Sequence, residues 1–517
     1  MAFGQLKEAA ASAPNRNRLF ATATLLSSAM FLAGCDVELK PFTGDELSVL
    51  ASNRAARMIQ AGQEPVEDQI DLYEAMARSL KYNLDVWVDR REEALRLGEK
   101  DLAEYDMLPD LVANAQYFSR DNQPGGRSVN LVTGVASTEP TRSTEKSYGE
   151  GDLTLSWDIL DFGMNFIRAD QKADEALIAM EQRRSTVNRV IEDVRSAYWR
   201  AVSAERLLGR LGALENRAQR ALRESESLSA RGATAPLDAL NYQRDLLLVL
   251  RSAQELRRDL SVAKSQLSAL MNLPPATHYT VEIPRRTAMP PAIRGSLDQL
   301  LTSAYLNRPE LREVSYRQRI NSREDEIAVL GALPGISALL GINTSTNDLL
   351  YNQDWVNIGA RVTWDAMNVA RLPNRLRNVE AGDDLLDARA LALTRAVAVQ
   401  VVVSVANYGA LRRELVTSAK YQNVSARILN ETRARAQSGE LGEQAQIKEE
   451  FEAILAELRF DLTYAETQTA YANLYSSIGL NPYAPDVTGN ESVADLSGSL
   501  RGLWARREDV SAVAQTN

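Results

Sequence analysis

Four segments of this chain alternate hydrophobic and polar residues with a period of two, the pattern of a strand whose two faces meet different surroundings. The residues on the hydrophobic side of the most regular strand are Leu153, Leu155, Trp157 and Ile159. A later strand puts Val362 and Trp364 on its hydrophobic side. We therefore expect strands over 108–120, 151–161, 335–345 and 355–366. The alternative is four strands that cover a soluble core, because those alternate in the same way.

Long helical patterns follow each pair of strands, and we expect two helical hairpins over 164–271 and 374–478. Residues 164–229 alone would span about 100 Å at 1.5 Å per residue. The hydrophobic stripe is broad and drifts between spacings of three and four, which favours helices with neighbours on both sides over a lone coiled coil. An ordinary helical bundle is the alternative.

The same pattern occurs twice, because Trp157 returns as Trp364 and Gly232 as Gly439, each 207 positions later. Such a duplication fixes the architecture. We expect two structural repeats, each with two strands and one hairpin, joined by a proline-rich linker. The first repeat would span 71–283, the linker 284–295 and the second repeat 296–482. A flexible C-terminal tail, 483–517, would follow.

The N-terminus has the pattern of a secretory signal over 1–34, with Arg16 and Arg18 before an apolar stretch. It ends in Leu32-Ala33-Gly34-Cys35, which resembles the lipobox of bacterial lipoproteins. Since Cys35 is the only cysteine of the chain, we expect it to carry lipid, palmitate included, with 35–70 as a lipidated segment and linker. An ordinary cleavage site or a short membrane anchor is the alternative.

Composition excludes several kinds of function. The net charge is −10, whereas a nucleic-acid partner calls for a basic face. One histidine, His278, and one cysteine cannot build a catalytic triad or a metal cluster. We therefore expect no enzyme activity, no catalytic or metal site, and no cofactor.

The most apolar stretch after the signal, 396–406, is interrupted by Gln400 and Ser404, so we expect membrane crossing by strands rather than by a helix. Strands of about 9–11 residues can span an outer membrane. Four strands cannot close a barrel, and open edges are not tolerated in lipid. Several protomers must then share one barrel, and three would supply 12 strands.

The repeat, the strand 155–163, the helix start at Arg308-Pro309-Glu310-Leu311 and the glycine-containing helical turns together resemble the TolC-like outer-membrane factor family. The resemblance covers roughly 45–485, and the lipobox is similar to that of the family's lipoprotein branch. It implies a mainly helical fold with a membrane β part, in which a homotrimer forms a 12-stranded barrel in outer-membrane lipid and a helical tunnel through the periplasm.

The resemblance further implies an exit duct of a tripartite efflux system, which reaches an inner-membrane pump through a periplasmic adaptor (membrane fusion) protein. The two hairpin turns would dock the adaptor, through Gly232, Leu237, Asp238, Gly439, Glu440 and Leu441. Threefold symmetry would turn Asp238, Glu440 and Glu443 into carboxylate rings that favour cations at a gate. These residues could equally be plain helix-turn residues.

Two other functions stay open. One is the outer-membrane component of a type I protein secretion system. The other is a lipoprotein scaffold that bridges periplasmic layers without forming a channel. A scaffold needs no lipid-facing side at Leu153, Leu155, Trp157 and Ile159.

Overall fold

The computed structural model describes residues 40–60, 62–66, 69–127, 129–130, 132–231, 235–274, 277–284, 295–481, 483 and 491–508. The chain divides into two compact units, Met1–Gly62 and Gln63–Asn517. The described part of the first unit holds one helix, α2 (Gly44–Gln60), which Thr43 and Glu46 cap reciprocally. This helix lies within 35–70, where the sequence predicted only a lipidated segment and linker. Cys35 lies outside the described residues.

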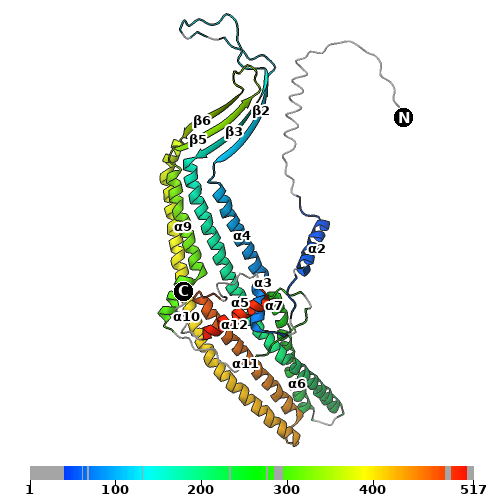
Figure 1. The fold of residues 1–517 in the computed structure, drawn as a ribbon. Coiled ribbons are helices and arrows are strands. Elements are labelled where there is room, and N and C mark those ends of the chain that lie inside the picture. Colours follow the sequence, from blue (N-terminus) through cyan, green and yellow to red (C-terminus); the bar gives the residue numbers. More distant parts are fainter. Residues whose placement is uncertain are drawn as a thin grey trace, which may run out of the picture. The chain divides into compact units, whose positions relative to one another are not determined.

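Most helices of the second unit occur twice, with equal lengths in each copy (Figure 1). The 11-residue pair is α3 (Leu72–Tyr82) and α8 (Leu297–Asn307). The 22-residue pair is α4 (Leu84–Tyr105) and α9 (Pro309–Leu330). The 72-residue pair is α5 (Ile159–Ala230) and α10 (Ala366–Gln437). The predicted internal duplication is thereby confirmed.

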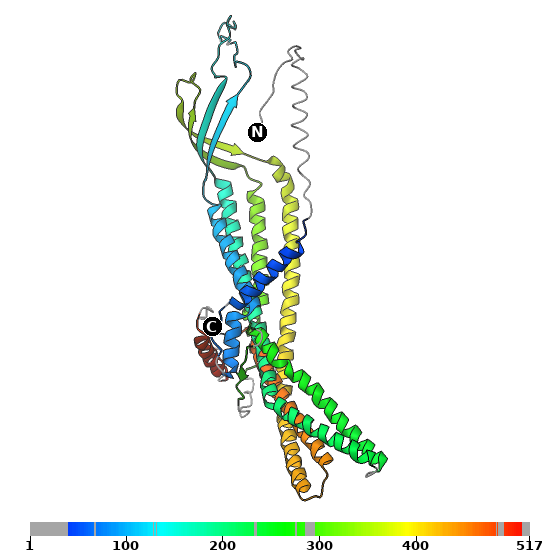
Figure 2. The same ribbon diagram turned by 90° about the vertical axis from the view of Figure 1, so that its right-hand side faces the viewer.

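Each long helix is followed by a turn and a returning helix. The first repeat returns through α6 (Pro236–Ser261) and α7 (Ala263–Leu270), which are interrupted at Val262. The second returns through α11 (Glu443–Ser477), which begins 207 positions after α6 and runs without a break. The ends of the two hairpins lie apart from each other in both ribbon views (Figure 2).

The four strands form one antiparallel sheet in the order β2-β3-β5-β6. The strands are β2 (Asp110–Ser119), β3 (Ser147–Asp158), β5 (Gly335–Ser345) and β6 (Asp354–Thr363). In the register, Leu153 lies opposite Ala113 on one side and Ile342 on the other. The two repeats therefore meet between β3 and β5, in the middle of the sheet.

Both long helices begin earlier than the sequence indicated, because an aspartate directly before each helix caps its first turn. Asp158 Oδ1 accepts hydrogen bonds from the amides of Leu160 and Asp161, and Asp365 Oδ1 accepts one from the amide of Met367. Such caps start a helix directly. The sequence pattern predicts helix starts at residues 164 and 374, the second directly after Pro373. The structure has Pro373 inside α10, near its start.

Segments near both ends of the second unit form a small belt around the long helices. β1 (Gln69–Ile70) pairs in parallel with β4 (Thr280–Val281). Helix α12 (Val493–Glu508) packs against α3. The prediction of a flexible tail is therefore wrong for these residues. The buried side chains of α12 include one hydrophobic residue in nearly every turn: Val493, Leu496, Leu500 and Trp504. That stripe was too sparse to recognise in a polar sequence.

Among the described residues, α10 is the one helix long and apolar enough to cross a membrane, judged by length and composition alone. An 18-residue window of it has a mean hydropathy of 1.6, and 11% of that window is buried. This differs from the sequence-based expectation, which treated Gln400 and Ser404 as interruptions. Because most of this apolar surface is not buried within the chain, α10 needs a partner that covers it.

Candidate functional site

The face of the sheet that carries Leu153, Leu155 and Trp157 is hydrophobic, and no other described part of this chain covers it. Its β3 side chains Leu153, Leu155 and Trp157 are 41%, 37% and 44% exposed. The neighbouring strands continue the face with exposed hydrophobic residues at matching register positions, namely Leu111, Ile336, Leu340, Ile342, Val356, Ile358 and Val362. A soluble protein rarely leaves so continuous an apolar surface open.

Two of the predicted lipid-facing residues lie outside the strands. Ile159 is the first residue of α5, and its side chain is exposed. Trp364 follows the last residue of β6, and its indole Nε1 donates a hydrogen bond to the carbonyl oxygen of Ala332, 3.1 Å away. An aromatic side chain with an anchored N–H suits the boundary between apolar and aqueous surroundings.

The opposite face of the sheet is mainly polar and internally hydrogen-bonded, with Val112, Phe118, Leu339 and Trp355 as hydrophobic exceptions. Amide side chains face carboxylates across neighbouring strands, with Asn114 Nδ2 3.1 Å from Asp152 Oδ2 and Gln116 Nε2 3.0 Å from Glu150 Oε2. Ser337 Oγ donates to Asp158 Oδ2 over 2.7 Å. The two faces thus have opposite solvent preferences, as in a sheet that separates lipid from water.

The outer edges of the sheet are open. Within the described residues, β2 and β6 each pair on one side only. All of their residues are exposed. Unpaired backbone groups beside a lipid-compatible face cost several kcal/mol each in a bilayer. The sheet is therefore incomplete as a membrane structure.

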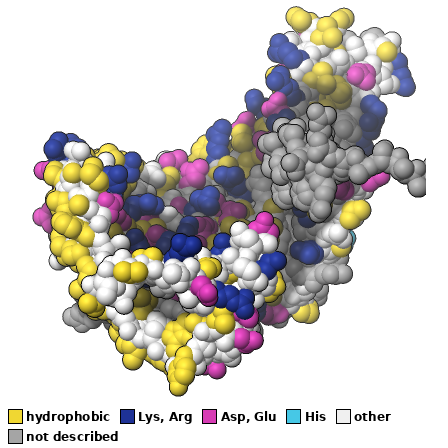
Figure 3. Space-filling view, turned by 90° about the horizontal axis from the view of Figure 1, so that it is seen from above, with side chains coloured by type: hydrophobic (Ala, Val, Ile, Leu, Met, Phe, Trp, Pro, Cys, Tyr) yellow, Lys and Arg dark blue, Asp and Glu magenta, His cyan; other side chains and the backbone are white. Residues whose placement is uncertain are grey.

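The long helices continue the sheet as a layer with one strongly charged groove. Its volume is about 540 Å³, and charged side chains of α4, α5, α9 and α10 line it together, including Glu92, Arg96, Glu175, Arg317, Glu324 and Arg389. Seen from above, Lys, Arg, Asp and Glu side chains gather in a hollow, and hydrophobic side chains gather along the outer rim (Figure 3). One side of the layer is accordingly suited to water.

Ion pairs between the two repeats hold this layer together. Near the sheet, Asp174 on α5 pairs with Arg319 and Arg323 on α9. Further along, arginines of α5 pair with carboxylates of α11 in an antiparallel series: Arg206 with Asp461, Arg210 with Glu457, and Arg217 with Glu450. The series fixes the register between the two hairpins.

The second hairpin turn is built around a glycine with a left-handed backbone. Gly439 has φ 80°, and the amide of Glu440 donates back to the carbonyl of Arg435 over 3.0 Å. This is the hydrogen bonding of a helix that ends at glycine. Glu440 and Leu441 follow in the exposed turn, and Glu443 is the first residue of α11.

The first hairpin turn is described in part. Gly232, one of the predicted docking residues, lies outside the described residues. Leu237 and Asp238 lie in the first turn of α6, where Leu237 is exposed. The turn therefore presents a hydrophobic side chain and an acidic side chain next to each other.

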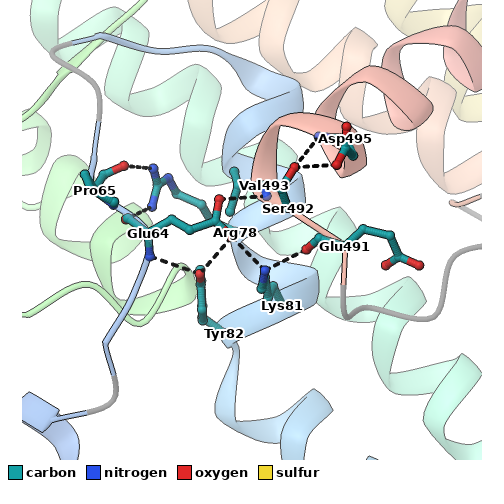
Figure 4. Close-up of polar contacts among 9 residues, drawn as sticks. All are labelled: Glu64, Pro65, Arg78, Lys81, Tyr82, Glu491, Ser492, Val493 and Asp495. Atoms are coloured by element: carbon teal, nitrogen blue, oxygen red, sulfur yellow. Dashed lines mark hydrogen bonds and ion pairs between the residues drawn. The ribbon is translucent and has the colours of Figure 1, made fainter.

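A polar cluster that the sequence did not reveal joins the start and the end of the second unit (Figure 4). The Glu64 carboxylate accepts hydrogen bonds from Lys81 Nζ at 2.6 Å and from the amide of Val493, the first residue of α12, at 2.9 Å. The buried Arg78 donates to the carbonyl oxygens of Glu64 and Pro65. The partners lie up to 429 positions apart, so no local pattern could have indicated them.

A second cluster buries arginines against aromatic rings beneath α12. The guanidinium of Arg195 lies 4.4 Å from the ring centre of Trp504, and that of Arg507 lies 4.7 Å from it. Burial lowers the pKa of Arg507 to about 10. Cation–π contacts of this kind stabilise a desolvated guanidinium. The contact of Arg195, a residue of α5, with Trp504 fixes the C-terminal helix onto the body of the long helices.

The hydrogen bond from Lys81, and then that from Val493, lower the pKa of Glu64 below its ordinary 4.5. A carboxylate with a lowered pKa stabilises the fold above its ordinary pKa, and that contribution is lost as pH falls through the lower folded value. We therefore expect Glu64→Gln to speed amide hydrogen exchange in the first turns of α12 at pH 7. The difference between the variant and the parent should narrow as pH falls through the lowered pKa of Glu64, because the parent carboxylate becomes protonated there. Equal exchange at pH 7 would contradict this role.

This chain is similar to a known protein family in sequence and to solved structures in fold. The family model of the outer membrane efflux protein matches residues 78–273, which is the first repeat. No curated protein gives a significant sequence match.

Solved structures match both repeats. The CmeC outer-membrane channel of Campylobacter jejuni superposes with a TM-score of 0.63 at 14% identity, over 83% of this chain and 89% of that one. The MtrE outer-membrane channel of Neisseria gonorrhoeae gives 0.59 at 15%, over 82% and 94%. The outer-membrane channel OprN gives 0.60 at 17%, over 79% and 89%.

The family match and the shared fold are those of channel proteins rather than of enzymes. The sequence-based resemblance to TolC-like outer-membrane factors is confirmed: residues 78–273 match the outer membrane efflux protein family, and both repeats share the fold of solved outer-membrane channels.

Proposed function

We propose that this chain forms a homotrimeric channel in the outer membrane that serves as the exit duct of a tripartite efflux system. The observation that carries the proposal is the four-stranded sheet, which has one exposed apolar face, one polar face and two open edges. Three copies, joined β6 to β2, would give 12 strands and leave no edge in lipid. The apolar face would contact lipid, and the polar face would line the pore.

The long helices extend the proposal into the periplasm. Three copies of the layer would form a closed wall with the charged groove on the water-filled side. The exposed hairpin turns would then meet a periplasmic adaptor, through Leu237 and Asp238 on one hairpin and Gly439, Glu440 and Leu441 on the other. An inner-membrane pump would act through that adaptor. The efflux description of the matching family supports efflux over protein secretion.

Native mass spectrometry of the protein extracted in detergent tests the assembly. We expect a mass of three chains. A monodisperse single chain, obtained in several mild detergents from intact outer membranes, would overturn the trimer and the shared barrel with it.

We also propose that Cys35 is lipidated, so that each protomer is tethered to the outer membrane beside its strands. We expect metabolic labelling with radioactive palmitate to mark the parent chain and not Cys35→Ala, because this cysteine is the residue that would carry the lipid. Equal labelling of both chains would contradict lipidation at Cys35.

The acidic residues of the tips are proposed to form rings that favour cations. Replacing Glu440 and Glu443 with alanine should reduce the cation preference of single channels, because each change removes three charges from the narrow end at once. Reversal potentials under a salt gradient measure this preference, with Glu431→Ala, on the helix above the turn, as the control. An unchanged reversal potential in the double variant would remove the gate role, and Asp238→Ala would then be tested in the same way.

A further inference from the structure

The two longest helices are repeats of each other, yet they are covered very differently. Helix α5 buries 27 of its 72 residues, whereas α10 buries nine of its 72. The reason lies in the order of the helices, in which α5 is central and α10 is at an edge (Figure 1). Helix α5 contacts α4, α6 and α7 of its own repeat, and α9 and α11 of the other. Helix α10 contacts α8, α9 and α11, all of its own repeat.

The missing neighbours of α10 can be named from the repeat. Helices α9 and α11, which cover the second side of α5, are the counterparts of α4 and α6. Within one chain, α4 and α6 lie at the opposite edge of the layer from α10 (Figure 1). A neighbouring copy of the chain would present these two helices to α10, in the way that α9 and α11 face α5.

We infer that α10 packs against α4 and α6 of a second copy, in the register that α5 has with α9 and α11 inside one chain. This inference rests on the trimer proposed above and adds the residues that meet at the subunit boundary. In the internal interface, Leu211 of α5 lies level with Ile454 of α11, as the flanking ion pairs require, and both are fully buried. The counterparts at the boundary, 207 positions later and earlier, are Ser418 and Leu247 of the next copy.

The side chains on the two open faces are complementary in this register. Leu207 and Leu458, buried in the internal interface, correspond to Glu414 and Arg251. A buried hydrophobic pair is thereby replaced by opposite charges. The Arg251 side chain is 76% exposed and contacts Glu255 of its own helix, which leaves the guanidinium accessible to a partner carboxylate.

The next level gives a second match. Leu214 and Phe451 correspond to Tyr421 and Arg244, an aromatic ring and a guanidinium, which attract each other when stacked. Near the sheet, an internal ion pair joins Glu181 of α5 to Arg312 of α9. Its counterparts at the boundary are Ala388 of α10 and Trp87 of α4, which occupies in α4 the place that Arg312 has in α9. Trp87 is half exposed in one chain, and a small residue opposite leaves room for its ring.

The ionic series of the internal interface has no counterpart at the boundary. Its three pairs correspond to Arg413 with Gln254, Thr417 with Leu250, and Val424 with Gln243. The paired residues therefore differ between the two kinds of interface: Leu207 and Leu458 are replaced by opposite charges, and the three ion pairs by pairs without opposite charges. Because the two interfaces carry different pairs, the edge helix of one copy is matched to the neighbour rather than to the internal interface. The subunit boundary also covers the apolar stretch of α10.

Cross-linking tests the register in the full-length membrane-inserted protein. Ser418→Cys and Leu247→Cys are introduced into separate chains that are co-expressed and treated with a short bis-maleimide, so that every product joins two chains. We expect covalent dimers from this pair. The matched control replaces Leu247→Cys with Leu240→Cys, which lies on the same exposed face about 10 Å along the helix, and should give far less product. Each single-cysteine chain alone controls for Cys35.

A charge reversal tests the contact independently. Glu414→Arg and Arg251→Glu, each alone, should lower the yield of trimer several-fold, and the double variant should restore it. Trimers that form normally yet cross-link no better at 418–247 than at 418–240 would overturn this register while leaving the trimer intact. Absence of any trimer in the parent chain would instead overturn the proposed function.

Discussion

Replacing Leu153 with arginine is expected to prevent correct assembly of the protein in the outer membrane. Leu153 lies in the middle of the apolar face, between Ala113 and Ile342. An arginine at the centre of a lipid-facing strand costs about 2–4 kcal/mol, and a trimer would bear that cost three times. The amount of SDS-resistant trimer in purified outer membranes measures the effect.

The control for this experiment is the adjacent residue. Thr154→Arg points to the polar face, where its neighbours on the adjacent strands are Val112 and Gly341, the second of which has no side chain. It should reduce the trimer little, because its charge would lie in the water-filled interior. Equal loss in both variants would show that the strand tolerates no arginine at all. Loss in Thr154→Arg alone would mean that the two faces are assigned the wrong way round.

Among the glycines of the described residues, Gly479 is the one at which an added methyl group is expected to disturb folding most. Gly479 ends α11 with φ 80°, and an added Cβ would lie 2.5 Å from the carbonyl carbon of Asn307. The left-handed backbone costs an alanine about 1–2 kcal/mol, and the forced overlap adds about 1–3 kcal/mol. The loss arises where α11 meets the junction of α8 and α9.

Gly439→Ala separates these two costs. Gly439 has the same φ of 80°, but nothing lies within 4 Å of its added Cβ. It should lower the thermal midpoint of the solubilised protein only modestly, whereas Gly479→Ala should lower it several degrees further or abolish folding. Similar midpoints in the two variants would contradict a close contact at Gly479. The equivalent position of the first repeat is Asn272, which adopts φ 52° with a side chain.

The repeat made much of the fold predictable from the sequence. Two weak patterns, each ambiguous alone, support each other when Trp157 and Trp364 recur with the same alternation before them. The period-two pattern also indicated which residues share a face, because successive strand residues point in opposite directions. The register of β3 with β5 brings Leu155, expected on the hydrophobic side of its strand, beside Leu340.

Element boundaries were less predictable, since they depend on single hydrogen bonds. The aspartates Asp158 and Asp365 have side chains that suit either the polar face of a strand or a helix cap. The sequence gives no way to choose between the two. Pro373 suggested a helix start because it removes one backbone donor, but a 72-residue helix tolerates that loss near its start.

Contacts between distant segments were not predictable. Helix α12 has a hydrophobic stripe of single residues per turn, and it is stable because α3 and the ring of Trp504 complete a shared core with it. Glu64 and Val493 meet only in the folded chain. The docking residues at the hairpin turns are a different case, because their role depends on a partner, and they stay predictions.

Single-channel recording of the purified protein in planar lipid bilayers tests the central claim most directly. The account predicts stepwise conductance from the parent protein, carried by an open pore through three shared sheets. A preparation that is trimeric, folded and inserted in the bilayer, yet passes no current under any condition that opens its relatives, would contradict it.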